Sequence, residues 1–379
     1  MKLTTEAEVA ECVADARGPL ALRGGGTRAV GRPVVGDVLD VSGLSGVTLY
    51  EPGALTIVVQ AGTPVSEIER TLAGENQRLA FEPYDLCGLL GTSGASTIGG
   101  VIATNASGPR RIQAGAARDF ALGVRFVDGA GTVIKNGGRV MKNVTGYDLV
   151  KLMAGSWGTL GVLTEVSLKV LPGVEDVTTL VIPDVSAPEA VAAMSRALSS
   201  SYEVSGAAWI EGAVWLRLEG FAASVAYRAG ALQKILAPFG ESALMPDADW
   251  TRVRDAQPLH GAEAVWRVSV KPSNGPLVLG ALPEGCDSLM DWGGGLIWIG
   301  QSGGNPAATH AALQAHVATL GGGHATLMKG PEALRAAGPV FQPEAAGVAA
   351  LSAALRTRFD PRSILNPGLM AAEPVRAAG

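Results

Sequence analysis

The sequence is poor in charged residues and in cysteine. Asp, Glu, Lys and Arg make up 17% of its 379 residues, whereas globular proteins average about 25%. This scarcity leaves two interpretations open: a surface that a partner covers, or a large core in a chain rich in alanine and glycine. The three cysteines, Cys12, Cys87 and Cys286, have no C-x-x-C spacing. We therefore expect buried thiols and no iron–sulfur cluster held by this chain alone.

The sequence also shows no basic tract, no long apolar run and no recognisable leader peptide. The net charge is −5, which argues against nucleic acid as a partner. No run reaches the ~18 apolar residues of a transmembrane helix. The N-terminal stretch carries Glu6, Glu8, Glu11 and Asp15, charges that a signal peptide lacks. We therefore expect a cytoplasmic protein without a membrane span, whose N-terminal helix starts with a capping box of Thr5 and Glu8.

Histidine is rare, and its positions argue against a metal site. The four histidines, His260, His310, His316 and His324, all follow Pro172 and include no His-x-His or His-x-x-x-His pair. On a helix His310 and His316 would point about 240° apart, so they would not share a metal. We expect no metal, and surface or helix-face positions for both.

Glycine, in contrast, is abundant, with 51 residues, and it is concentrated in three loops. The first (RGGGTR, residues 23–28) follows the apolar strand LALR. The second (residues 91–108) sets Thr and Ser hydroxyls beside glycines and leads into a short helix at GGVIA. The third (GSWGTLGVLTE, residues 155–165) precedes a strand. Glycine amides and hydroxyls at a helix start suit phosphate groups, although a tight structural turn remains the alternative for the first loop.

Two common phosphate-binding motifs do not fit the first loop. A Rossmann motif needs G-x-G-x-x-G at the opening of a helix, but residues 30–38 (VGRPVVGDV) contain helix-breaking glycine and proline. A P-loop needs Gly-Lys-Ser/Thr, which does not follow. We infer a phosphate cradle without a following helix, in which the amide of Gly25 faces a pyrophosphate.

The order of expected elements predicts an α+β fold of more than one domain. Residues 1–172 contain strands, a helix that starts near Pro64, a hairpin turn at Asp128-Gly129 and a last strand that ends at Pro172. Beyond them β-α-β-β-α recurs loosely, which is typical of an antiparallel sheet with helices on one face. Its tryptophans are expected in the core: Trp209, Trp215, Trp266, Trp292 and Trp298. We set the boundaries at 1–172 (subdomains 1–45 and 46–172), 173–340 for a cap domain, and 341–379 for a segment that returns to the first domain.

Several motifs together carry a resemblance to a known family. LRGGGT, STIGGVIATNASG, KNVTGYDLVKLMAGSWGTLGVLTEVSLKVLP and FDPRSILNPG resemble the PCMH-type FAD-binding domain of the vanillyl-alcohol-oxidase superfamily, over residues 20–172 and 359–368. Within it, the stretches that begin at ATNASGPRR and at GPVFQPEAAG are similar to the FAD-binding subunits of bacterial glycolate oxidases. The resemblance implies a flavoprotein of the oxidoreductase class, with a PCMH-type domain of two α+β subdomains and a smaller cap domain.

The resemblance also implies which residues bind FAD. They are Arg23, Gly24, Gly25, Gly26, Thr27 and Arg28 around the pyrophosphate; Thr92, Ser93, Gly94, Ser96, Thr97, Gly99, Gly100 and Val101 along the diphosphate and ribityl chain; and Gly161 and Val162 through backbone groups. Trp157 stands where the family often has Glu, which removes any polar contact of that carboxylate. Some relatives bind FAD covalently through a histidine of the FAD domain. Since no histidine precedes residue 260, we expect non-covalent FAD.

The resemblance finally implies an accessory role. The paired histidines and metal of hydroxy-acid-oxidising relatives are missing, so the catalytic residues stay unknown, with Arg110 and Arg111 as weak candidates for facing the flavin or binding a carboxylate. We expect a subunit that works with a catalytic flavin subunit and an iron–sulfur subunit to oxidise glycolate or D-lactate and is inactive alone. Its exposed apolar patch is expected on the cap domain or on the rim of the FAD domain near Arg110 and Arg111. A location at the inner membrane face through these partners stays open. The alternatives are a self-sufficient FAD-dependent 2-hydroxy-acid dehydrogenase and a structural subunit with a vestigial FAD site.

Overall fold

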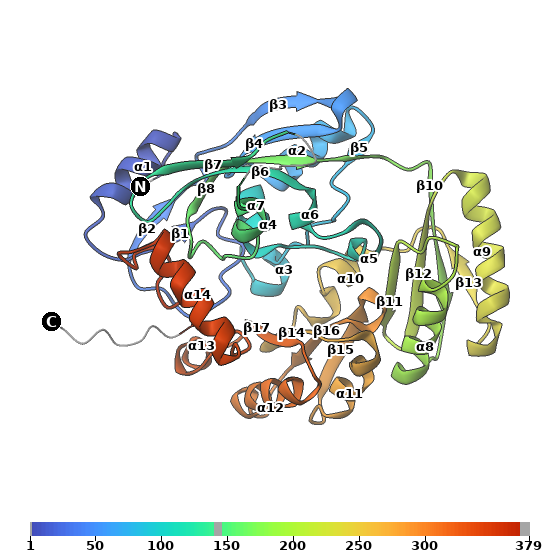
Figure 1. Ribbon diagram of the computed structural model, residues 1–379. Helices are drawn as coiled ribbons and strands as arrows, with labels where there is room; N and C mark the ends of the chain where they lie inside the picture. The colour runs from blue at the N-terminus through green and yellow to red at the C-terminus, as the bar shows by residue number, and fades with distance from the viewer. Residues whose placement is uncertain (1, 140–145, 372–379) are drawn as a thin grey trace. The chain divides into compact units, whose positions relative to one another are not determined.

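The computed structural model describes residues 2–139 and 146–371 and separates into two compact units (Figure 1). The first unit comprises Met1–Ala106, Ala116–Pro172 and Arg335–Gly379, and the second comprises Ser107–Gly115 and Gly173–Leu334. The boundaries expected from the sequence differ at two places. Residues 107–115, which had been assigned to the first domain, pack with the second unit, and the return to the first unit begins at Arg335 instead of residue 341.

The first unit is built on a five-stranded antiparallel sheet of order β3-β4-β8-β6-β7. Its strands are β3 (Val47–Glu51), β4 (Thr56–Gln60), β6 (Ala121–Val127), β7 (Val133–Gly137) and β8 (Val162–Lys169), and its helices include α2 (Val65–Ala73), α3 (Cys87–Leu90), α4 (Ile98–Thr104), α6 (Ala117–Phe120) and α7 (Leu149–Met153). The expected hairpin is β6–β7, the expected helix after Pro64 is α2, and Asp148 caps α7 by accepting the Lys151 N–H.

A smaller layer of the first unit joins the N-terminal and C-terminal segments. Helix α1 (Glu6–Asp15) carries the expected Thr5–Glu8 capping box, and the parallel strands β1 (Leu20–Arg23) and β2 (Asp37–Asp40) follow it. Leu20 also forms a bridge with Leu365. One buried cluster therefore includes Leu3 and Val9 from the start of the chain together with Ile364 and Leu365. The helix α14 (Ala346–Phe359) precedes this returning segment.

The second unit is an eight-stranded antiparallel sheet of order β13-β10-β12-β11-β15-β16-β14-β17. From residue 173 on, its strands and helices follow in chain order. They are β10 (Asp176–Ile182), α8 (Ala187–Leu198), β11 (Gly206–Ile210), β12 (Ala213–Gly220), α9 (Ala222–Leu236), β13 (Ala243–Met245), the short α10 (Thr251–Arg254), β14 (Ala264–Ser269), α11 (Gly275–Gly280), β15 (Cys286–Asp291), β16 (Leu296–Gln301), α12 (Pro306–Thr319) and β17 (His324–Lys329). The order β-α-β-β-α thus occurs twice, as the sequence predicts, and the fold is α+β.

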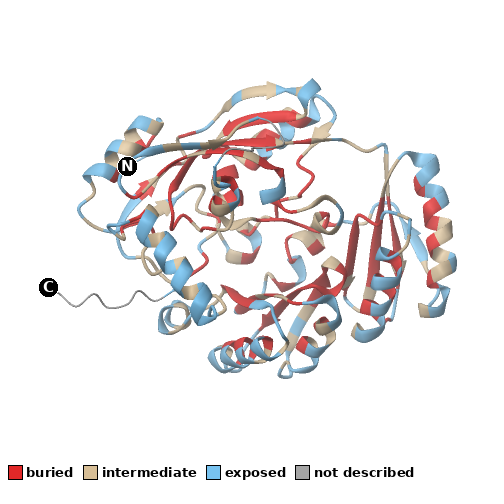
Figure 2. Cartoon of the chain, viewed as in Figure 1, coloured by how far each residue is buried: buried red, intermediate tan, exposed pale blue. Residues whose placement is uncertain are grey.

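Burial follows the two sheets, whose inner strands are the most buried elements (Figure 2). Trp266 and Trp298 lie in the core of the second unit, as predicted. Two expectations were wrong. The three cysteines are half-buried instead of buried, and Trp209 and Trp292 are half-buried instead of lying in the core. His310 lies on the face of α12 that packs on the sheet, one of the two positions expected for it, and its Nδ1 accepts the indole N–H of Trp266 at 3.1 Å.

Candidate functional site

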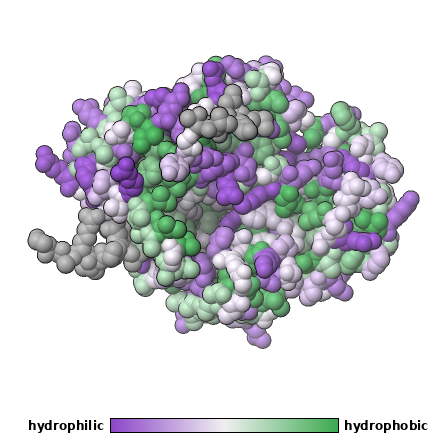
Figure 3. All heavy atoms as spheres, viewed as in Figure 1, coloured by the Kyte–Doolittle hydropathy of each residue, from purple (hydrophilic) through white to green (hydrophobic). Residues whose placement is uncertain are grey.

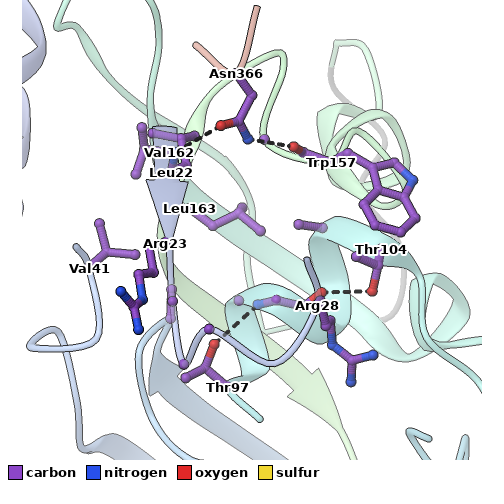
Figure 4. A pocket seen from close by; sticks show the side chains of 18 of the residues that line it. Leu22, Arg23, Arg28, Val41, Thr97, Thr104, Trp157, Val162, Leu163 and Asn366 are labelled. Atoms are coloured by element: carbon purple, nitrogen blue, oxygen red, sulfur yellow. Dashed lines mark hydrogen bonds between the residues drawn. The ribbon is translucent and has the colours of Figure 1, made fainter. Parts of the chain in front are cut away.

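A cavity of about 410 Å³ lies in the first unit, lined by the first glycine loop, α4, the third glycine loop and the returning C-terminal segment. Figure 4 shows the labelled side chains around it. Its walls are apolar where Leu22, Val41 and Leu163 lie, and polar groups reach it from Arg23 and Arg28. Volumes of about 300–1,000 Å³ with mostly apolar walls and a few convergent polar groups are typical of cofactor sites.

The first and second glycine loops pack directly on each other's backbone. A Cβ on Gly25 would lie 1.6 Å from the carbonyl oxygen of Ala95, and a Cβ on Gly94 would lie 1.8 Å from the carbonyl oxygen of Gly25. The structure thus gives a different reason for Gly25 from the expected approach of a pyrophosphate. Glycine is needed at this position because the second loop occupies the space of a side chain, and Gly25 itself lines the cavity.

Two arginines supply the positive charge of the cavity. The Nη2 of Arg28 donates to the carbonyl of Tyr84 at 2.8 Å and to the Ser96 hydroxyl at 3.0 Å, and its guanidinium lies 5.1 Å from the centre of the Tyr84 ring. These contacts hold Arg28 in one orientation. Arg23 lies at the end of β1, beside Gly26, which has a φ of +72°. Guanidinium groups, bare glycine amides and the hydroxyl of Thr27 are the donors that a diphosphate requires.

The opposite wall of the cavity is closed by the third loop and the C-terminal segment. The side chain of Asn366 accepts the Leu22 N–H at 2.8 Å and donates to the Trp157 carbonyl at 2.9 Å (Figure 4). Trp157 has a left-handed backbone with φ of 54°, and its N–H donates to the Ala103 carbonyl at 2.9 Å. Asn366 therefore connects β1 to the third loop through two hydrogen bonds. Leu369, from the same C-terminal segment, also lines the cavity.

The structure brings most of the expected cofactor residues to this cavity. Its lining includes Arg23, Gly24, Gly25, Gly26, Thr27, Arg28, Thr97, Gly99, Gly100, Gly161 and Val162. The lining does not include Thr92, Ser93, Gly94, Ser96 and Val101. The Ser96 hydroxyl accepts a hydrogen bond from the guanidinium of Arg28, which does line the cavity. Val101, on α4, is fully buried. Sequence reasoning missed Leu22, Trp157, Asn366 and Leu369 as lining residues, although Asn366 lies in the quoted motif FDPRSILNPG.

Arg110 and Arg111 do not belong to the first unit. The Arg110 guanidinium donates to both carboxylate oxygens of Glu219, at 2.9 Å and 2.5 Å, and these side chains are only 8% and 5% exposed. This bidentate pair holds residues 107–115 on the second unit. Arg110 is thus engaged by Glu219 within the second unit, while Arg111 lies over the ring of Trp292 at 4.5 Å.

Two classes of site have no counterpart in the described residues. Across residues 2–139 and 146–371, no group of three or more His, Cys, Asp and Glu side chains is arranged to hold a metal ion. Within the same ranges, no helix combines the length and the apolar character that crossing a membrane requires. The quoted motif KNVTGYDL lies partly outside the described residues, at positions 142–145.

Comparisons with known proteins identify relatives along the whole chain. A family model described as an FAD binding domain matches residues 1–137. The chain is 36% identical over 370 residues to glycolate oxidase subunit GlcE of Escherichia coli (strain K12), an alignment that covers 97% of this chain and 96% of that protein. Glycolate oxidase subunit GlcD of Bacillus subtilis (strain 168) is 35% identical over 167 residues, which cover 43% of this chain and 34% of that protein.

Solved structures with the same fold include alkyldihydroxyacetonephosphate synthase. Its structure superimposes with a TM-score of 0.72 and covers 97% of this chain and 75% of that one, at 17% sequence identity. An identity this low shows the fold alone. A D-lactate dehydrogenase of Archaeoglobus fulgidus is 34% identical over 165 residues, 44% of this chain and 36% of that protein.

Proposed function

The chain belongs to the glycolate oxidase subunit GlcE family of FAD-binding proteins, and from this premise we propose that it is the flavin-carrying accessory subunit of a complex that oxidises glycolate or D-lactate. The observation that carries the proposal is the cavity of the first unit. Glycine amides, two arginines and threonine hydroxyls gather there at one end of an apolar space, which fits a dinucleotide with a flat aromatic ring system.

The residues of the chain divide the work of holding FAD. Arg23, Arg28 and the amides of Gly24–Gly26 bind the diphosphate, while Leu22 and Val41 exclude water from the ring system. The chemistry supplied by bound FAD is two-electron oxidation of an alcohol. The protein fixes the position of the cofactor and its electrostatic surroundings, and the sequence relatives place it among oxidoreductases that act on 2-hydroxy acids.

Electrons have to leave through another protein, and we propose a catalytic flavin subunit and an iron–sulfur subunit as the partners. The low charge content of 17% supports this assignment. So does an apolar stripe on α14, where Val348, Leu351 and Leu355 are 52%, 68% and 39% exposed. Figure 3 shows apolar side chains gathered on this part of the first unit. We place the complex in the cytoplasm, with any attachment to the inner membrane face made through the partners.

Anaerobic reduction of the flavin tests this function. The purified chain, loaded with FAD, is mixed with glycolate or D-lactate while the visible flavin absorption is followed. We expect no bleaching by the chain alone, and bleaching when the flavin and iron–sulfur subunits of the same organism are present. Bleaching by the chain alone would instead support a self-sufficient dehydrogenase. Failure to bind FAD after reconstitution would support a structural subunit.

A further inference from the structure

Trp157 places an indole in the wall of the cavity of the first unit. Its side chain is half-buried, and Figure 4 shows the ring at the edge of the cavity, on the side where Thr104 lies. Of the described residues that line this cavity, Trp157 alone is aromatic. A flat ring that is bound here and stacks on an aromatic side chain therefore has to use Trp157.

Hydrogen bonds on both sides of Trp157 fix its backbone. Its N–H donates to the Ala103 carbonyl at 2.9 Å, and its carbonyl accepts from the side chain of Asn366 at 2.9 Å. The next residue, Gly158, packs so closely on β1 that a Cβ there would lie 2.9 Å from the Cδ1 of Leu22. Contacts from α4, the C-terminal segment and β1 thus set the direction of the Cα–Cβ bond of Trp157. The indole is positioned before a cofactor binds.

The backbone of the third loop suits glycine better than tryptophan at position 157. The φ angle is 54° at Trp157, between 91° at Gly155 and 72° at Gly158. A left-handed backbone is unfavourable for a bulky side chain, and strain of this kind is concentrated at functional sites. An indole at a position where the loop favours glycine indicates that the ring makes a contact that offsets this strain.

One aromatic contact within the chain supports the indole without enclosing it. The ring centroids of Trp157 and Phe341 lie 5.1 Å apart with their planes at 69°, which is an edge-to-face arrangement. Phe341 belongs to the returning segment that begins at Arg335, so both rings lie in the first unit. Edge-to-face geometry covers at most one face of the indole. Phe341 therefore leaves at least one face of Trp157 for a second ring.

We propose that the indole of Trp157 stacks on one of the two ring systems of FAD and is thereby a determinant of cofactor affinity. This inference rests on the proposed function for the presence of FAD in the cavity. The isoalloxazine and the adenine of FAD are both flat aromatic heterocycles, and stacking on an aromatic side chain contributes substantially to the binding of such rings. The Glu that the family often has at this position could not make the contact.

Calorimetric titration of the full-length chain, freed of flavin, tests the contact without any turnover. The probes are FAD, ADP and FMN. We expect the affinity for FAD to be weaker by at least about fivefold in Trp157→Leu, and to stay within about twofold of the wild type in Trp157→Phe, which keeps an aromatic face. Weaker binding of ADP in Trp157→Leu would identify adenine as the stacked ring, and weaker binding of FMN would identify the isoalloxazine.

Trp209→Leu is the matched control for these variants. Trp209 is also a half-buried tryptophan, but it lies in the second unit and is not part of the cavity lining. This variant should bind FAD with the affinity of the wild type.

Fluorine NMR provides a second measurement, made on the wild-type fold. The chain contains seven tryptophans, and after labelling with fluorotryptophan the signal of Trp157 is the one missing from Trp157→Phe. Ring currents of a stacked ring should shift this signal when FAD is added, and leave that of Trp209 in place. An unmoved Trp157 signal, or wild-type FAD affinity in Trp157→Leu, would overturn the proposal. A wild-type chain that binds no FAD would overturn the proposed function itself, so the two failures are distinguishable.

Discussion

A single carbon atom at residue 25 would displace the backbone of another loop. Gly25→Ala places its Cβ 1.6 Å from the Ala95 carbonyl oxygen, and backbone cannot give way as a flexible side chain can. We expect the two glycine loops to separate, with FAD affinity at least tenfold lower and a stability loss of about 1–3 kcal/mol. Flavin fluorescence titration and thermal melting measure both.

Gly53→Ala is the matched control for this substitution. A Cβ at Gly53 meets nothing within 4 Å, so this variant should bind FAD as the wild type does. Wild-type affinity in Gly25→Ala would show that the loop contact does not shape the cavity.

His324 makes stability depend on pH. The residue is exposed overall, yet partial desolvation of the ring, and then the charges of Arg267 and Arg111, lower its pKa from 6.5 to about 4. Between these values the unfolded chain binds a proton that the folded chain does not. His324 therefore lowers stability as pH falls from about 6.5 to about 4.

In His324→Gln this contribution disappears, so we expect a shallower fall of the melting temperature over the same pH interval. Equal slopes in His324→Gln and the wild type would contradict the assigned cause.

The residues that line the cavity show which cofactor-binding positions can be predicted from the sequence and which cannot. Arg23–Arg28 stood out because glycines follow a strand, and Gly161 because glycine precedes one. Val101 was misplaced because the loop pattern does not say which side of the short helix α4 faces a ligand. For Gly25 the structure adds a second reason, the approach of Ala95, a contact between segments 70 residues apart that no local pattern contains.

At the scale of elements, one buried ion pair helps to hold the segment 107–115 on the second unit. Arg110→Met leaves the Glu219 carboxylate buried with Arg217 at 3.9 Å. Removing one partner of a buried pair costs about 3–5 kcal/mol, and we expect the low end because Arg217 stays. Urea unfolding measures the loss, and hydrogen exchange should show residues 107–115 losing protection first.

Arg252→Met is the control for this pair. Its partner Glu211 is 59% exposed, so the expected loss is about 0–1 kcal/mol. In the double variant Arg110→Met/Glu219→Leu the buried carboxylate is gone, while the buried Arg217 guanidinium stays and keeps its hydrogen bonds to Ser205, so only part of the stability should return. A loss in Arg110→Met as small as in Arg252→Met would contradict the structural role.

The C-terminal segment contributes one side chain that connects two other elements of the cavity. Asn366 has φ of 45°, so Asn366→Gly keeps the backbone conformation and removes only the bonds to Leu22 and Trp157. We expect FAD to bind about tenfold more weakly, as the loss of two hydrogen bonds of about 0.5–1.5 kcal/mol each implies. Stopped-flow release of flavin would show a faster off-rate.

Asn76→Gly provides the comparison, because Asn76 has a similar φ of 49° and is not part of the cavity lining. It should release FAD at the wild-type rate. Identical release from both variants would remove Asn366 from the site.

Individual helices and strands were easier to predict from the sequence than the segments of the chain against which they pack. The capping box, the β6–β7 hairpin and the repeated β-α-β-β-α order follow from local patterns of caps, turns and alternation, and the structure confirms them. The assignment of residues 107–115 to the second unit depends on Arg110 meeting Glu219, 109 positions away. Charge and spacing alone do not show such a pairing.

At the scale of the whole molecule, histidines and cavity lie in different units. The four histidines of the sequence fall within Gly173–Leu334, whereas the cavity lining belongs to the first unit. We therefore expect FAD to be held without a covalent histidyl bond. Acid precipitation of the holoprotein should release the yellow colour into the supernatant, with free FAD carried through the same steps as the recovery standard. Colour that stays in the pellet would contradict this.

The return of the chain to the first unit sets an order of events during synthesis. Leu163 and Asn366 line the same cavity, but a ribosome makes about 200 residues between them, which takes on the order of 10–40 s. The second unit is translated in that interval. Until Asn366 emerges, the nascent cavity has no closing wall and the cluster around Leu3 lacks Ile364 and Leu365. Cofactor loading is therefore a late event, and a chaperone that shields the open first unit would have to stay until the second has been made.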